Sequence, residues 1–150
     1  MMEIERKYLI NPTDILTLKK GEGKNIVQSY LKEKSGIELR LRIMGNEGFL
    51  TVKKVISERS RHELETKVDA SFIKNLLEIF DLKKLEKTRY SIVHKNNLWE
   101  IDFFKGKHEG LVLAEIELND ENEVFELPPW IEKEVTNDQT YYNSYLFELL

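Results

Sequence analysis

The amino-acid sequence predicts a mostly β protein of the α+β class: an eight-stranded antiparallel β-barrel that forms a tunnel and is covered by helices. Three observations support this class. Charged and apolar residues alternate with period two in short segments along the chain, which is typical of strands. Helical periodicity is confined to a few stretches. Charged residues make up 33% of the chain, above the roughly 25% of an ordinary domain, and many fall within the predicted strands.

The expected strands start near the N-terminus, where residues 2–9 alternate charged and apolar side chains. Seven further segments follow the same rule: residues 26–32, 38–43, 49–55, 61–67, 88–95, 98–104 and 111–118. Turn-forming residues at 45–48 and 96–97 join neighbouring segments and predict hairpins. The order of the strands is therefore expected to be mostly antiparallel.

Four stretches are expected to be helical. They are a short helix at residues 12–20, an amphipathic helix at 71–80, a helical turn at 128–130 and a terminal helix at 138–150. The terminal helix carries several tyrosines and leucines, so it is expected to pack on an apolar surface. The sequence leaves two other roles open for it: a gate at one tunnel mouth, or an exposed apolar face that supports a homodimer.

The composition limits the class of protein. The 150 residues suit a single domain spanning 1–150, and the absence of cysteine excludes disulfides and thiolate chemistry. The chain starts without an apolar leader and holds no run of about 18 apolar residues, so we expect a cytoplasmic protein with no membrane span. The net charge of -4 argues against nucleic acid as the partner.

The charged strand faces carry the functional prediction. One such face alone is best interpreted as solvent-exposed. Six or more strands, however, carry two charges at positions i and i+2, and a barrel of about eight strands can enclose one small ligand. We therefore expect these faces to point inward. The acids would be Glu3, Glu5, Glu63, Glu65, Asp102, Glu115 and Glu117, and the bases would be Lys7, Arg40, Arg42, Lys53, Lys87 and Arg89.

This mixture of acids and bases indicates a ligand, because buried charges are costly unless they are paired or neutralised. Carboxylate groups bind hard cations such as Mg²⁺ or Mn²⁺. Arginine and lysine bind phosphate oxygens, and arginine can do so with two parallel hydrogen bonds. The two sets together predict a site for a polyphosphate and a divalent metal.

The motifs resemble those of the CYTH superfamily, also called triphosphate tunnel metalloenzymes. Residues 3–7 resemble the family's ExExK signature. The other motifs follow in the family's order: RxR at residues 40–42, TxK at 51–53, ExE at 63–65, KxR at 87–89, and the last two acidic strands at 99–102 and 114–118. The matches cover nearly the whole chain and keep every charged position.

The resemblance implies a tunnel that hydrolyses or cyclises triphosphates with Mg²⁺ or Mn²⁺. Residues 135–143 look most like those of small bacterial members, for which inorganic tripolyphosphate is a common substrate. The leading hypothesis is therefore a cytoplasmic triphosphatase that splits tripolyphosphate into pyrophosphate and phosphate. The alternatives are a class IV-type adenylate cyclase, a thiamine triphosphatase, and a polyphosphate-binding module without catalysis.

Roles follow from this hypothesis. The expected metal ligands are Glu3 and Glu5, with Glu115 and Glu117 across the tunnel and Asp102 beside a second ion. The expected phosphate-binding residues are Lys7, Arg40, Arg42, Lys53, Lys87 and Arg89. Lys87 is expected to stabilise the leaving phosphate, and Glu63 and Glu65 to orient the attacking water or to bind the second ion. Arg6 has the opposite parity to Glu5 and is expected outside the tunnel. Tyr30 is expected to serve packing, and the alternative is that it points inward and contacts phosphate.

Overall fold

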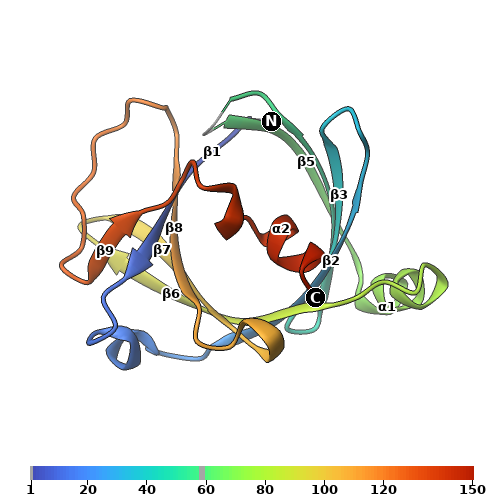
Figure 1. Cartoon of the computed structure of the whole chain (residues 1–150), viewed down its shortest axis with the longest axis horizontal. Helices are drawn as coiled ribbons and strands as arrows, with labels where there is room; N and C mark the ends of the chain where they lie inside the picture. Colours follow the sequence, from blue (N-terminus) through green and yellow to red (C-terminus); the bar gives the residue numbers. More distant parts are fainter. Residues whose placement is uncertain (1, 58–59) are drawn as a thin grey trace.

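The computed structural model of the protein describes residues 2–57 and 60–150 (Figure 1). Its strands form one continuous sheet. In chain order they are β1 (Met2–Ile10), β2 (Lys24–Lys32), β3 (Ile37–Met44), β4 (Glu47–Val55), β5 (Ser60–Asp69), β6 (Leu85–His94), β7 (Asn97–Phe104), β8 (Val112–Leu118) and β9 (Ile131–Glu134). Every pairing between these strands is antiparallel.

The first eight strands close into a barrel. The sheet runs in the order β5-β4-β3-β2-β6-β7-β8-β1, and pairing of β1 with β5 joins its two ends. Glu3 lies opposite Arg61 at this junction, and on the other side of β1 Glu5 lies opposite Glu117. The predicted eight-stranded antiparallel barrel is confirmed. The short strand β9 was not expected; it pairs with the end of β1, where Tyr8 lies opposite Glu134.

The apolar faces of β1, β7 and β8 point outward and are covered. Trp99 and Ile116 are fully buried there, packed with Tyr8 beneath the chain that leads to β9. The ring of Trp99 meets those of Phe125 and Trp130 edge to face, at centroid distances of 5.9 and 5.6 Å. This outer core keeps the opposite face of the same strands free for charged side chains.

The helices differ in part from the prediction. Helix α1 (Ala70–Ile79) matches the expected amphipathic helix and packs Ile73 and Leu77 on Leu41 outside the barrel. The expected helix at 12–20 is only the 3₁₀ turn η1 (Ile15–Leu18), because just Leu18 of that turn is buried. A turn forms where the helical turn was expected near residues 128–130, and the N–H of Ile131 donates to the carbonyl oxygen of Pro128 at 3.2 Å. A second 3₁₀ turn, η2 (Gly106–His108), follows β7.

The C-terminal segment is not one helix. It forms the 3₁₀ turn η3 (Gln139–Tyr141) and the short helix α2 (Asn143–Glu148), separated by Tyr142 in an extended conformation. Figure 1 shows α2 within the ring of strands rather than on its outer surface. There Leu146 packs against Leu85, Phe104 and Leu113.

These apolar partners belong to the same strand faces as the charged residues, at one end of the barrel. The terminal helix therefore covers an apolar surface as expected, but that surface lies inside. The homodimer stays a prediction. No helix among the described residues is long and apolar enough to cross a membrane.

Candidate functional site

The inward faces of the strands enclose a cavity of about 470 Å³. This volume lies within the ~300–1,000 Å³ of typical small-molecule sites. Twelve of the thirteen charged residues that the sequence placed in the tunnel line it, and the exception is Asp102, which is 1% exposed and bonded to Lys87 and Arg89. The C-terminal segment contributes Tyr142 and Asn143 to the lining. Strand alternation thus brings residues from all eight barrel strands to one site.

Arg42 on β3 is a buried cation that has no counter-ion among the described residues. Its side chain is buried, and its Nε donates to Oε1 of Gln28 at 2.9 Å. Within residues 2–57 and 60–150, Arg42 forms no ion pair. Burial, together with the nearby positive charges of Arg40 and Arg89, lowers the pKa of its guanidinium to about 9. This position favours an anion in the cavity.

Arg40 is partly satisfied by the wall. Its Nη2 donates to Oε2 of Glu65 at 3.2 Å and to Oγ1 of Thr51 at 3.3 Å. The Thr51 hydroxyl also donates to Glu65, at 2.8 Å, so the carboxylate is held beside the guanidinium. The Nε of Arg40 is buried and has no acceptor among the described residues. These contacts thus leave one donor of this arginine unsatisfied among the described residues.

Lys87 and Arg89 on β6 share the carboxylate of Asp102 on β7. The Nζ of Lys87 donates to Oδ2 of Asp102 at 2.6 Å and to Oδ1 of Asn143 at 2.7 Å. Arg89 donates through Nε to Oδ1 and through Nη2 to Oδ2 of Asp102, at 2.7 and 2.8 Å.

These contacts determine the protonation states of Asp102 and Lys87. Burial would raise the pKa of Asp102, but Arg89 and Lys87 outweigh it and hold that pKa well below its usual range. Burial lowers the pKa of Lys87 to about 7, and the charges of Arg89 and Arg42 act in the same direction. The sequence predicted Asp102 as a metal ligand. In the structure, both of its oxygens accept hydrogen bonds from Arg89, and one of them also accepts from Lys87.

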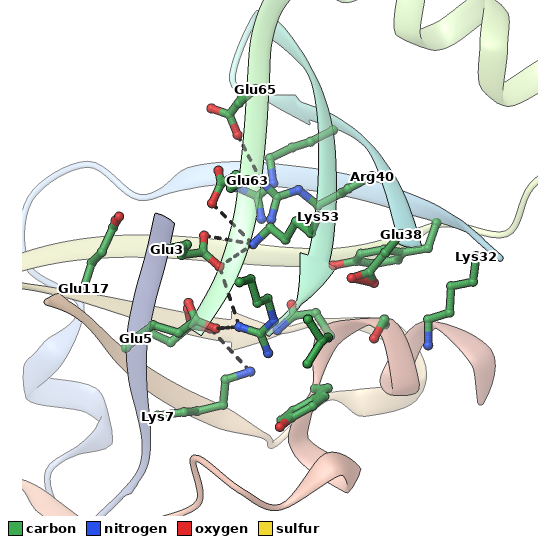
Figure 2. Close-up of a pocket in the computed structure, with 18 of the residues that line it drawn as sticks. Glu3, Glu5, Lys7, Lys32, Glu38, Arg40, Lys53, Glu63, Glu65 and Glu117 are labelled. Atoms are coloured by element: carbon green, nitrogen blue, oxygen red, sulfur yellow. Dashed lines mark hydrogen bonds and ion pairs between the residues drawn. The ribbon is translucent and has the colours of Figure 1, made fainter. Parts of the chain in front are cut away.

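Carboxylates gather in another part of the wall, where Figure 2 shows Glu3 and Glu63 beside Lys53. Glu3 accepts two hydrogen bonds from Nζ of Lys53, at 2.8 and 2.9 Å, and Arg61 donates to Glu5 at 2.9 Å. Burial raises the pKa of Glu3, and its hydrogen bond with Glu63 raises it further. The acids are therefore crowded enough to compete for protons.

Glu117 belongs to the same group. Burial raises the pKa of its carboxyl, and the negative charges of Glu3, Glu5 and Glu100 add to this effect. Glu5 differs, because Lys53, Lys7 and Arg61 outweigh burial and the charge of Glu3 and lower its pKa. Such a set of oxygen donors suits a hard divalent cation. No three carboxylates of the described residues already stand in a metal-binding arrangement, because lysine and arginine hold several of their oxygens.

Several site residues were missed by the sequence interpretation. Arg61 has the same parity as Glu63, so strand alternation could have identified it. The ring of Tyr142 lies 5.4 Å from the guanidinium of Arg61 and 5.5 Å from Nζ of Lys7. Tyr142 and Asn143 lie in the C-terminal segment, and no pattern in the sequence placed that segment inside the barrel.

Tyr30 lines the cavity, whereas Arg6 lies outside the barrel. Tyr30 was expected to serve packing, but its buried hydroxyl accepts a hydrogen bond from Nε2 of Gln28 at 2.6 Å and it lines the cavity. Arg6 lies outside the tunnel, as its parity indicated. Its Nε donates to Oε2 of Glu134 at 2.8 Å, which ties β9 to β1.

The chain is similar in sequence to one protein family and to two inorganic triphosphatases. The family model described as the CYTH domain matches residues 1–145. An inorganic triphosphatase from Acetivibrio thermocellus is 39% identical to the chain over 145 residues, which cover 96% of this chain and 92% of the relative. An inorganic triphosphatase from Nitrosomonas europaea is 38% identical over 152 residues, with 97% of each protein covered.

A solved structure agrees with these relatives. The crystal structure of an inorganic triphosphatase superimposes on this chain with a TM-score of 0.64 and 37% sequence identity. The alignment covers 97% of each chain, so it includes the strands that line the cavity and the C-terminal segment.

Proposed function

The chain belongs to the CYTH family, and from this premise we propose that it hydrolyses inorganic triphosphate to pyrophosphate and phosphate inside the tunnel. The observation that carries the proposal is the buried guanidinium of Arg42, which has no counter-ion among the described residues and faces a cavity that also holds a group of acids. A buried cation of this kind is costly in the free protein and is compensated when a polyanion binds.

The basic wall supports binding of a phosphate chain. Arg40 and Arg42 come from β3 and Lys87 and Arg89 from β6, the strands on either side of β2, and all four line one cavity. Arg40 retains a free donor, and Lys87 retains one of its three ammonium protons beyond those given to Asp102 and Asn143. We assign these groups to the oxygens of the substrate, where positive charge stabilises the charge that develops during phosphoryl transfer.

The acidic wall supports a divalent cation, with Mg²⁺ or Mn²⁺ as the proposed ion. Glu3, Glu5 and Glu117 are the carboxylates that we assign to it, and Glu115 lies next to them on β8. When bound, the ion neutralises phosphate charge and lowers the pKa of a bound water. Lys53 and Arg61, which hold Glu3 and Glu5 in the free protein, would then turn toward the phosphate chain.

Two groups are assigned to proton movements. Glu63 interacts with Glu3 and lies 3.9 Å from Nζ of Lys53, and we assign to its carboxylate the proton of the attacking water. Lys87 is placed to donate a hydrogen bond to the leaving phosphate from the basic wall. Glu65 is held by Arg40 and Thr51, and we assign it to orienting that arginine rather than to the water.

A small linear substrate suits the space that remains. The segment from Gln139 to Ser144 lines the cavity, and α2 fills one end of the barrel. The test is a panel of tripolyphosphate, ATP and thiamine triphosphate, each incubated with the protein and Mg²⁺ or Mn²⁺. We expect phosphate release mainly from tripolyphosphate, and no release when a chelator removes the metal.

Other outcomes would identify the alternatives. Cyclic AMP formed from ATP without free phosphate would indicate a cyclase. Tight binding of tripolyphosphate without turnover under any metal would indicate a binding module. The variant Lys87→Ala should lose turnover, whereas Lys54→Ala, which removes an exposed lysine from β4, should retain it.

A further inference from the structure

Two neutral amides connect the cations of the basic wall. Gln28 on β2 is fully buried, and its Oε1 accepts the hydrogen bond from Nε of Arg42. Its Nε2 donates to Oδ1 of Asn143 at 3.2 Å, and the same oxygen accepts the hydrogen bond from Lys87 at 2.7 Å. A continuous path of hydrogen bonds therefore runs from Arg42 through Gln28 and Asn143 to Lys87.

The partners fix the orientation of both amides. Arginine and lysine side chains only donate hydrogen bonds. Gln28 must therefore turn its oxygen toward Arg42, which leaves its NH₂ group for Asn143 and for the hydroxyl of Tyr30. Asn143 must present its oxygen, because both of its neighbours in the path donate to it. The Tyr30 hydroxyl accepts from Gln28, so its own proton stays available to another acceptor.

Neutral acceptors suit the positions beside Arg42 and Lys87 better than carboxylates do. A carboxylate beside Arg42 or Lys87 would hold the cation but would also cancel part of its charge and repel phosphate. An amide oxygen holds the donor in one direction and leaves its full charge for the ligand. Lys87 already has one carboxylate partner in Asp102, so a second would leave little net charge at this position.

We propose that Gln28 and Asn143 are positioning residues, an amide bridge that aims Arg42 and Lys87 at the same bound triphosphate. This inference rests on the proposed function. It also gives the C-terminal segment a part in the site, because Asn143 is the first residue of α2 and reaches Lys87 only when that helix lies inside the barrel. The amides act through the cations and do not take part in the chemical step.

The test compares Asn143→Ala with Asn143→Asp. We measure binding of tripolyphosphate to the metal-free protein by calorimetry, together with kcat, KM and thermal stability. The alanine variant loses the acceptor, so affinity for tripolyphosphate should fall by about 10-fold, as expected when a hydrogen bond to a charged group is lost. The aspartate variant keeps the acceptor oxygens and should retain the melting temperature, yet its affinity should also fall because of the added negative charge.

A structural role would give a different result. If Asn143 only holds α2 in place, the alanine variant should lose melting temperature and yet, at a temperature where it is folded, bind tripolyphosphate like the wild type. That result would overturn the proposal. Glu148→Gln serves as the control on α2, since it removes only the exposed ion pair with Lys32, and it should bind normally.

Gln28 provides a second line of evidence. The variant Gln28→Met should weaken binding of tripolyphosphate to a similar extent. The double variant with Asn143→Ala should lose little more affinity than the single variant that binds less tightly, because both substitutions break the same path. Losses that multiply would show that the two amides act separately. Asn25→Ala is the matched control: this exposed amide on β2 accepts from Lys105 and Thr88 outside the tunnel.

The wild type separates this proposal from the proposed function. If it binds tripolyphosphate without hydrolysing it, the proposed function fails, but the affinities of the variants still test whether the amide bridge positions the two cations. If it hydrolyses tripolyphosphate and the variants bind it as tightly as the wild type does, only the bridge fails. If it neither binds nor hydrolyses tripolyphosphate, both proposals are overturned.

Discussion

Replacing Arg42 by methionine should make the free protein more stable and, at the same time, remove its affinity for triphosphate. The guanidinium is buried among other cations, and its only hydrogen bond to a described side chain is the one to Gln28. Methionine has a similar length and no charge, so it fills the same space without the desolvation cost. Opposite effects on stability and on function are the signature of a residue that is kept for a ligand.

The magnitude follows from the pKa of Arg42, which burial lowers from 12.5 to about 9. At ~1.4 kcal/mol for each pKa unit, the fold disfavours the charged guanidinium by about 5 kcal/mol. Methionine leaves Oε1 of Gln28 without its donor, which costs about 1–3 kcal/mol. The net gain is about 2 kcal/mol or more. In a chain of this size that corresponds to a rise in Tm of about 4–8 °C.

The pH dependence has a definite sign. Below pH 9 both the folded and the unfolded chain carry the charge, so the full stabilisation by methionine is present there. As the pH rises from 9 toward 12.5, the folded protein loses the proton before the unfolded chain does, and the difference between variant and wild type shrinks.

Thermal unfolding and calorimetric titration with tripolyphosphate provide the assay for Arg42→Met. The control is Lys54→Met, which removes an exposed lysine outside the barrel and should change the free energy of unfolding by less than about 0.5 kcal/mol. A clear loss of stability in Arg42→Met, or unchanged affinity for tripolyphosphate, would refute the reasoning. Either result would mean that Arg42 serves the fold rather than a ligand.

Three further predictions address other parts of the molecule. Burial lowers the pKa of Lys87 to about 7, so much of this side chain is uncharged at pH 8 and binding of tripolyphosphate should be accompanied by uptake of a proton. Calorimetry in buffers of different ionisation enthalpy measures this uptake, which should be smaller in Lys87→Met. Glu117→Gln removes one charge from the acidic wall and should weaken Mn²⁺ binding by about 10-fold in a direct titration; unchanged affinity would exclude it as a ligand. Gly48→Ala places a Cβ 2.8 Å from the backbone oxygen of Val68, so chemical denaturation should show a loss of about 1–3 kcal/mol.

Much of the barrel could be predicted because its pattern is local. In a strand, successive side chains point to opposite faces, so the parity of Glu3, Glu5 and Lys7 is fixed once the segment is extended. The same reasoning placed Arg6 outside. The limits of α1 were also predictable, since its buried residues Ile73 and Leu77 follow helical spacing.

Other elements could not be predicted, because long-range contacts create them. Strand β9 has four residues and an irregular pattern; it exists because it pairs with β1 and because Glu134 bonds Arg6, 128 positions away in the chain. The tail was expected to be one helix. Docking inside the barrel instead gives Tyr142 an extended backbone and places Asn143 beside Lys87, 56 positions earlier.

The sequence by itself determined which charges face the tunnel, because alternation along a strand assigns every side chain to a face. Only the tertiary structure decided how those charges are paired. The register between β6 and β7 brings Asp102 to Lys87 and Arg89, and the register between β2 and β3 places the neutral Gln28 opposite Arg42. The reason is physical: the face of a residue is set by its own strand, whereas its partner is set by strand register and by the path of the C-terminal segment, and both depend on packing across the whole barrel.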